Sequence, residues 1–140
     1  MGKLIEFAGN HPLLASATII MVLAVLFYEL RLKAAGVAAL SANQAVQLIN
    51  KGARIIDIRD RDKFDAAHIV DAAHVAPAEL EDYVSKKVKK AKPVVVVCDT
   101  GARSGQVIAA LRRAGHSNAF NLKGGLTGWK AANLPLVSTK

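Results

Sequence analysis

Cysteine is nearly absent from this chain, and charge is entirely absent from one of its segments. Cys98 is the single cysteine among 140 residues, so no disulfide bond can form within the chain. A lone thiol suits a reducing compartment. Between Phe7 and Tyr28 there is no Asp, Glu, Lys or Arg, whereas charged residues recur at normal density from there to the C-terminus. The composition indicates a hydrophobic segment attached to a soluble domain.

The uncharged segment predicts a membrane-spanning helix. A bilayer core requires about 20 residues of apolar helix, and the stretch from Phe7 to Tyr28 meets that length with an aromatic residue at its end. A cleaved signal peptide is the alternative, with small residues at 37–39 as its cleavage site. Lys3 is the only basic residue ahead of the stretch, however, and the stretch exceeds a normal signal-peptide apolar region. We expect residues 1–33 to form one transmembrane anchor.

The basic residues that flank this segment predict its orientation. Lys3 stands alone on the N-terminal side, while Arg31 and Lys33 follow closely on the other side. The side richer in Lys and Arg normally stays in the cytoplasm. We therefore expect a single-pass protein of the inner (cytoplasmic) membrane, with its N-terminus outside and its globular domain in the cytoplasm.

The remainder of the chain predicts one small α/β domain over residues 41–140, joined to the anchor by a connector of small residues over 34–40. Ser41 and Gln44 form a capping-box pattern at the start of a helix that ends at Gly52. Further helices are expected over 78–90, over 104–114 and around Trp129, and strands over 54–59, 74–76, 94–97 and 118–122. The alternation predicts a mostly parallel central sheet flanked by helices. The four valines of 94–97 suit a central strand covered on both faces.

The segment that follows these valines carries the candidate nucleophile. The strand delivers Cys98 to the carboxyl edge of a parallel sheet, where α/β active sites usually lie. If the loop after it curls around the sulfur, successive main-chain N–H groups form an anion-binding nest. Gly101 permits so tight a loop, and the following helix N-terminus and Arg103 add positive charge. These features favour thiolate over thiol, so we expect an exposed, ionised Cys98.

Three ordered stretches of this sequence resemble the single-domain rhodanese family. Cys98–Ser104 (CDTGARS) resembles its C-x-x-G-x-R-S active-site loop, and Gly124-Gly125…Gly128-Trp129 resembles its C-terminal G-G…G-W element. The upstream signature, typically D-V-R…E-F…G-H-I-x-G-A-x-N-I, is resembled by Asp57-Ile58-Arg59, Phe64 and residues 67–75. The similarity runs from Ser41 to about Pro135. With its N-terminal span, the chain resembles the single-pass, membrane-anchored rhodaneses of proteobacteria.

The resemblance implies a rhodanese-type sulfurtransferase similar to thiosulfate sulfurtransferases. Cys98 would carry sulfane sulfur as a persulfide from a donor to a thiophilic acceptor, each a small molecule or a protein, with no cofactor. The residues expected to bind substrate and persulfide are Asp99, Thr100, Gly101, Ala102, Arg103 and Ser104. Ala67 and Asp71 replace glycines of the family signature. Asp99 stands where many thiosulfate-using members have a basic residue, which should weaken binding of a dianion and favour a donor such as a protein persulfide.

Two other functions are compatible with this fold. Rhodanese-like phosphatases have five residues between cysteine and arginine, whereas four separate Cys98 from Arg103, and Val97 replaces the histidine that precedes a phosphatase nucleophile. The shorter loop encloses a space better suited to sulfur than to a phosphoryl group. The stronger alternative is a non-catalytic interaction module that recruits or accompanies membrane proteins.

Several polar residues outside the loop have a structural interpretation and a functional one. Asp57 and Arg59 end a strand at the edge that holds Cys98, where they line the substrate entrance or, more simply, form an ion pair. His68 and His74 are six residues apart with no cysteine or carboxylate to complete a ligand set, so we expect no metal site. The lysines between Lys86 and Lys92 predict a solvated face or a contact with anionic lipid. No aromatic residue interleaves with them, which disfavours nucleic acid.

Overall fold

The computed structural model describes residues 1–139, except for the side chains of 34–37, and divides the chain into two compact units, Met1–Gly36 and Val37–Lys140. The first unit holds helices α1 (Gly2–Asn10) and α2 (Pro12–Val37). The expected span from Phe7 is interrupted at His11, because proline disfavours helical backbone in the preceding residue and is itself favoured at a helix start. Residues Pro12–Lys33 are long and apolar enough to cross a membrane, and none of their most apolar stretch is buried within the chain.

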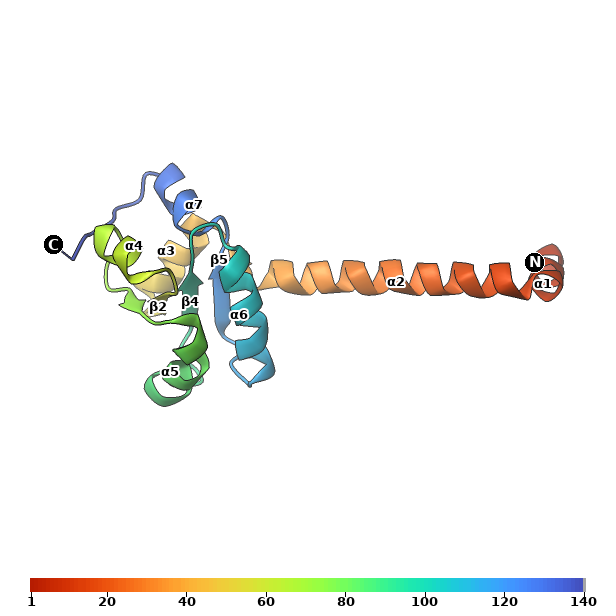
Figure 1. Ribbon diagram of the computed structural model, residues 1–140, viewed down its shortest axis with the longest axis horizontal. Coiled ribbons are helices and arrows are strands. Elements are labelled where there is room, and N and C mark those ends of the chain that lie inside the picture. The colour runs from red at the N-terminus through yellow and green to blue at the C-terminus, as the bar shows by residue number, and fades with distance from the viewer. Residues whose placement is uncertain (140) are drawn as a thin grey trace. The chain divides into compact units, whose positions relative to one another are not determined.

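The second unit is an α/β domain around a five-stranded sheet in the order β1-β5-β4-β2-β3, in which every neighbouring pair is parallel (Figure 1). The strands are β1 (Ala39–Leu40), β2 (Arg54–Asp57), β3 (Ala73–His74), β4 (Val94–Val97) and β5 (Ala119–Leu122). The helices are α3 (Ala42–Asn50), α4 (Arg61–Ala66), the 3-10 turn η1 (Pro77–Glu79), α5 (Leu80–Lys87), α6 (Ala102–Arg113) and α7 (Gly125–Ala131). The prediction of a small α/β domain with a parallel central sheet is confirmed.

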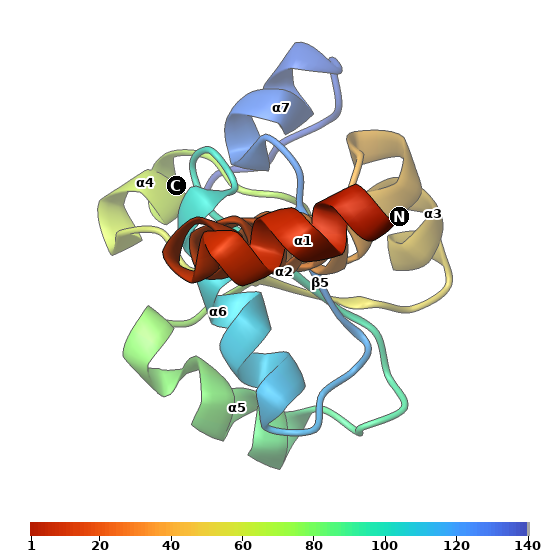
Figure 2. The same ribbon diagram turned by 90° about the vertical axis from the view of Figure 1, so that its right-hand side faces the viewer.

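Helices cover both faces of the sheet, and β4 lies between them. Val94 and Val96 pack in one apolar cluster with residues of α5 and α6, while Val95 and Val97 pack in a second cluster with residues of α3 and α7. All four valines are buried. In Figure 2, α3 and the pair α5 and α6 lie on opposite sides of β5. Successive side chains of a strand point to opposite faces, so a run of four valines fills both cores at once.

The ends of several elements differ from those that the sequence predicts. Residues 34–40, expected as a connector, are divided between the end of α2 and the edge strand β1, which is held to β5 by Asn121 N–H donating to Ala38 O (2.6 Å). The helix expected over 78–90 ends at Lys87 because Val88 turns into extended backbone and is buried. The capping box of Ser41 and Gln44 forms as predicted.

Candidate active site

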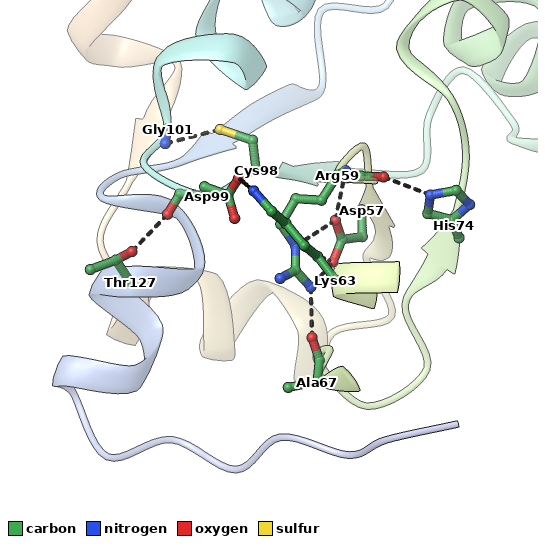
Figure 3. A network of polar contacts seen from close by, with 9 residues as sticks. All are labelled: Asp57, Arg59, Lys63, Ala67, His74, Cys98, Asp99, Gly101 and Thr127. Carbon is green, nitrogen blue, oxygen red and sulfur yellow. Dashed lines mark hydrogen bonds and ion pairs between the residues drawn. The ribbon is translucent and has the colours of Figure 1, made fainter. Parts of the chain in front are cut away.

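Cys98 follows the last residue of β4, at the carboxyl edge of the sheet. A loop of three residues leads from it to α6, which begins at Ala102. The neighbouring strand β2 ends at the same edge, since Asp57 is level with Val97 in the sheet register. Figure 3 shows Cys98, Asp57 and Arg59 gathered there. The parallel topology thus brings together residues that are about forty positions apart in the sequence, at the edge where α/β proteins place their chemistry.

Main-chain and hydroxyl groups converge on the Cys98 sulfur. The Gly101 N–H donates to Sγ at 3.0 Å, and the Ser104 hydroxyl lies 3.2 Å from Sγ. Gly101 takes a φ of +91°, which glycine adopts without strain, and a Cβ there would lie 3.0 Å from the Leu122 carbonyl oxygen. The loop therefore needs glycine at 101 both for its backbone conformation and for its close approach to the end of β5.

These donors determine the ionisation of the thiol. Burial by itself raises the pKa of Cys98, because it disfavours the charged form. Hydrogen bonds from the Ser104 hydroxyl and from the main-chain amides of Ser104, Gly101 and Thr100 outweigh that effect and leave the pKa of Cys98 below its ordinary value. The site therefore favours a thiolate, which is the nucleophilic form of cysteine.

The loop residues expected to bind substrate divide into two groups. Gly101, Ser104 and the Thr100 amide act on the sulfur. Ala102 and Arg103 are exposed on the first turn of α6, and within the described residues Arg103 makes no hydrogen bond or ion pair.

Cys98 itself is only 2% exposed, so the thiol is less accessible than the sequence predicts. Its side chain packs in the apolar cluster that includes residues of α5 and α6.

Helix α7 fixes the direction of the loop carbonyls. The Leu126 N–H donates to Cys98 O at 2.8 Å, and both the N–H and the hydroxyl of Thr127 donate to Asp99 O, at 3.2 and 3.0 Å. A Cβ on Gly125, whose φ is +56°, would lie 2.4 Å from Cys98 O. The G-G element of the sequence is therefore part of the site. Thr127, which the sequence motifs do not identify, contacts the loop directly.

Asn121, on β5, completes the support of the loop and was not predicted. Its Nδ2 donates to Gly101 O at 3.1 Å, and its Oδ1 is an alternative acceptor for the single Ser104 hydroxyl proton, which points either to Oδ1 or to the Cys98 sulfur. Because a carbonyl oxygen only accepts, the contact with Gly101 determines which side of the amide faces Ser104. Asn121 thus holds in place the hydroxyl that contacts the sulfur. No sequence signal marks it, since it lies within a strand.

Asp57 and Arg59 form a buried ion pair rather than an open site edge. The Arg59 Nη2 lies 2.7 Å from Asp57 Oδ2, their side chains are 5% and 1% exposed, and the same nitrogen donates to Ala67 O at 2.7 Å. His74 donates to Arg59 O and His68 to Phe64 O, each at 2.7 Å. The pair and both histidines thus hold the segment that links β2 to β3. Within residues 1–139, no group of three His, Cys, Asp or Glu side chains is arranged to hold a metal ion.

The carboxylate beside the nucleophile has a basic partner. Lys63 Nζ on α4 lies 2.8 Å from Asp99 Oδ2, and both side chains are about half exposed (54% and 44%). Figure 3 shows the Lys63 side chain reaching from α4 toward the loop that holds Cys98. An ion pair this exposed contributes little to stability. Its effect is to cancel the negative charge that Asp99 places next to the sulfur.

A family model described as rhodanese-like domain matches residues 41–132. The uncharacterized protein YibN of Escherichia coli K12 is 36% identical over 143 residues, which cover all of both chains. The thiosulfate sulfurtransferase GlpE of Coxiella burnetii is 38% identical over 89 residues, 63% of this chain and 82% of its own length. The solution structure of a rhodanese-like domain from Anabaena sp. superposes with a TM-score of 0.65 and 28% identity, over 72% of this chain and 79% of that one.

Replacing Gly125 by alanine tests the contact between α7 and the loop. Gly52→Ala is the matched control, because Gly52 also has a positive φ but its Cβ would meet nothing within 4 Å. Left-handed strain costs about 1–2 kcal/mol in both variants, and the collision with Cys98 O should cost Gly125→Ala about 2 kcal/mol more. The measurement is the free energy of unfolding in denaturant. Equal losses would refute the close packing described for Gly125.

Replacing Ser104 by alanine tests the hydroxyl contact with the sulfur. The variant should raise the pKa of Cys98, because the thiolate loses its side-chain donor while its burial is unchanged. The rate of iodoacetamide alkylation should then rise at higher pH than in the parent chain, and should be lower at neutral pH. Ser117→Ala, at an exposed serine, should leave the profile unchanged. A Ser104→Ala profile identical to that of the parent would show that the hydroxyl does not stabilise the thiolate.

Proposed function

Because the chain belongs to the rhodanese-like domain family, we propose that it is a membrane-tethered sulfurtransferase that carries sulfane sulfur on Cys98. The observation that carries the proposal is the convergence of the Gly101 amide and the Ser104 hydroxyl on a thiol of lowered pKa. The relative GlpE is named a thiosulfate sulfurtransferase, which supports thiosulfate as one donor.

In the first half-reaction, the Cys98 thiolate attacks the outer sulfur of thiosulfate. A sulfur–sulfur bond forms on Cys98, the sulfur–sulfur bond of thiosulfate breaks, and sulfite leaves with the bonding electron pair. The product is a persulfide whose terminal sulfur is anionic. In the second half-reaction, a thiophilic acceptor such as a thiolate or cyanide attacks that terminal sulfur and regenerates the Cys98 thiolate. Neither step requires a base, because the attacking groups are already ionised.

The main-chain amides supply what both half-reactions need. Negative charge resides on the thiolate at the start and on the terminal sulfur of the persulfide afterwards. Fixed amide donors in a water-poor site stabilise such charge without reorganising. The Ser104 hydroxyl adds a donor that can rotate, so it can follow the charge as the sulfur chain grows by one atom.

The tether is proposed from α2. Residues Pro12–Lys33 meet the length and composition of a single span, and the match to YibN extends over the whole chain, this helix included. Arg31 and Lys33 at the end of the span favour a cytoplasmic domain with the N-terminus outside. A cytoplasmic location keeps Cys98 reduced and ready to accept sulfur.

The ion pair of Lys63 with Asp99 bears on the choice of donor. Because Lys63 pairs with Asp99, their charges cancel beside the sulfur. The pair therefore neither repels nor attracts a dianionic donor strongly. The site should therefore use thiosulfate less efficiently than a site with an unpaired cation. We propose persulfides of small thiols or of proteins as donors alongside thiosulfate.

One observation favours the alternative of a non-catalytic module that accompanies membrane proteins. Cys98 is only 2% exposed, so a donor must displace part of the surrounding structure to reach the sulfur. A sulfur-loading experiment distinguishes the two functions, because a module that only binds partners does not acquire sulfur on Cys98.

Sulfur loading of the full chain in detergent tests the proposed activity directly. After incubation with thiosulfate and removal of the donor, intact-mass spectrometry should show the addition of one sulfur atom. Cyanide should remove that atom and release thiocyanate. Cys98→Ser should remain unmodified, while Ser117→Ala should load like the parent. Absence of the adduct with both thiosulfate and glutathione persulfide would favour the non-catalytic module.

The Lys63 and Asp99 substitutions test donor selection. Asp99→Asn frees the Lys63 ammonium and should raise kcat/KM for thiosulfate about tenfold, as expected for one charge acting on a dianion about 6 Å away in a water-like dielectric. Lys63→Met should lower kcat/KM by a similar factor, because it leaves Asp99 uncompensated. Both effects should be smaller for benzenethiosulfonate, which carries one charge. Equal effects on the two donors would show that the pair acts on loop geometry and not through charge.

A further inference from the structure

The parallel sheet has two distinct edges, one formed by the amino ends of its strands and the other by their carboxyl ends. All strands run in one direction, so the residues that precede each strand meet at the edge opposite to Cys98. There Arg54 N donates to Pro93 O at 2.8 Å, and Asn118 Nδ2 donates to Ala91 O at 3.3 Å. These bonds join the loops that precede β2, β4 and β5. Figures 1 and 2 show α5 and the end of α6 at one end of the domain, with α7 and the loop after β4 at the other.

Charge is distributed unequally between the two edges. The carboxylates of this unit lie between residues 57 and 82 or at Asp99, all in segments that follow the carboxyl end of a strand. The loops directly before β2, β4 and β5 (residues 51–53, 88–93 and 114–118) and the last residues of α5 and α6 contain none. Instead they present a set of exposed basic residues, here named the basic edge: Lys51, Lys87, Lys89, Lys90, Lys92 and Arg113. Among the described residues, none of these six forms an ion pair.

Helix stability explains only part of the basic edge. A cation in the last turn of a helix interacts favourably with the helix dipole, which accounts for Lys87 on α5 and Arg113 on α6. Lys89, Lys90 and Lys92 lie beyond the end of α5 and gain nothing of this kind. Placing these like charges within a few residues of one another without counter-charges costs free energy through repulsion. An anionic partner would remove that cost.

We infer that the basic edge binds the anionic headgroups of a lipid bilayer. The inference rests on the proposed tether, since the candidate span ends at Lys33 and β1 begins at Ala39, which leaves five residues between span and sheet. So short a connection reaches at most roughly 20 Å even when fully extended, which gives even weak charge contacts with the headgroups a high effective concentration. A nucleic acid is the less suitable polyanion, because no exposed aromatic side chain lies among the basic residues to stack on bases.

Binding of the basic edge to headgroups would orient the active site relative to the bilayer. Cys98 lies at the edge opposite to the basic edge, so headgroup binding directs the sulfur toward the solution and away from the bilayer. Soluble donors and acceptors then reach Cys98 without competing with lipid. The carboxylates at or directly after the carboxyl ends of β2 and β4, namely those of Asp57, Asp60, Asp62, Asp65 and Asp99, lie on that distal side, away from the anionic surface.

The experiment uses the full chain in lipid nanodiscs, with a nitroxide label on Ala91→Cys in a Cys98→Ser background. Ala91 is exposed within the basic edge. In discs of phosphatidylcholine with phosphatidylglycerol, the label should be several-fold less accessible to a water-soluble relaxation agent than in discs of phosphatidylcholine alone. High salt should abolish the difference, because screening removes contacts between exposed charges. A label on Lys130→Cys, at the opposite edge, should remain accessible in both lipids.

Charge reversal provides the matched comparison. Lys89→Glu with Lys90→Glu should restore access to the label in anionic discs, whereas Lys123→Glu with Lys130→Glu, which changes the net charge equally at the opposite edge, should not. Equal access in the two lipids, or equal effects of the two pairs, would overturn the inference. Co-elution of the chain with the discs reports separately on the tether, and sulfur loading of Lys89→Glu with Lys90→Glu in the native Cys98 chain reports separately on the sulfurtransferase.

Discussion

The site depends on the hydrogen bonds that α7 makes to the carbonyls of the loop after β4. A trans peptide unit is planar, and its C=O and N–H point in opposite directions. When Thr127 holds Asp99 O outward, the N–H of Thr100, which belongs to the same peptide unit, must point inward. The contact of Leu126 with Cys98 O fixes the preceding unit in the same way. The Thr100 amide faces the sulfur because the Asp99 carbonyl is bound by Thr127, and Gly125 is the residue that lets α7 approach the loop closely enough to make these contacts.

This arrangement makes the thiolate depend on dipoles more than on a formal charge. Burial acts against ionisation of Cys98, and the opposing contributions come from Ser104, Gly101 and Thr100. Arg103 is exposed and contributes none. A fixed cation beside the sulfur would bind the anionic persulfide tightly and slow its transfer. Amide dipoles stabilise thiolate and persulfide alike, since both place one negative charge within the same ring of donors.

The sequence predicted the elements of this site better than their contacts. The valine run before Cys98 specifies a buried parallel strand, and the strand–loop–helix order specifies where the sulfur lies, because both follow from local pattern and topology. Thr127 and Asn121 could not be found in this way. Thr127 acts on a loop 28 positions earlier and Asn121 on one 20 positions earlier, and neither residue type is unusual where it stands. The partnership of Lys63 with Asp99 was missed for the same reason. The low exposure of Cys98 depends on its packing with residues of α5 and α6, which the loop motif does not describe.

The two edges of the sheet bind negative charge by different means, and the topology explains why. Helix α6 begins at the carboxyl edge and ends at the opposite one, so the positive end of its dipole lies near Cys98 and the negative end lies at the basic edge. Main-chain donors suit a single sulfur anion, because they are fixed and reach it at hydrogen-bond distance. The negative end of a helix dipole repels anions, so a surface there attracts them only through side chains that extend past the helix end, and lysine supplies these. Lipid headgroups form a diffuse and mobile array of charges, which a rigid ring of amides cannot match. Attraction to such a surface requires proximity but no fixed contact geometry. The exposed, flexible lysines beyond the end of α5 are therefore sufficient.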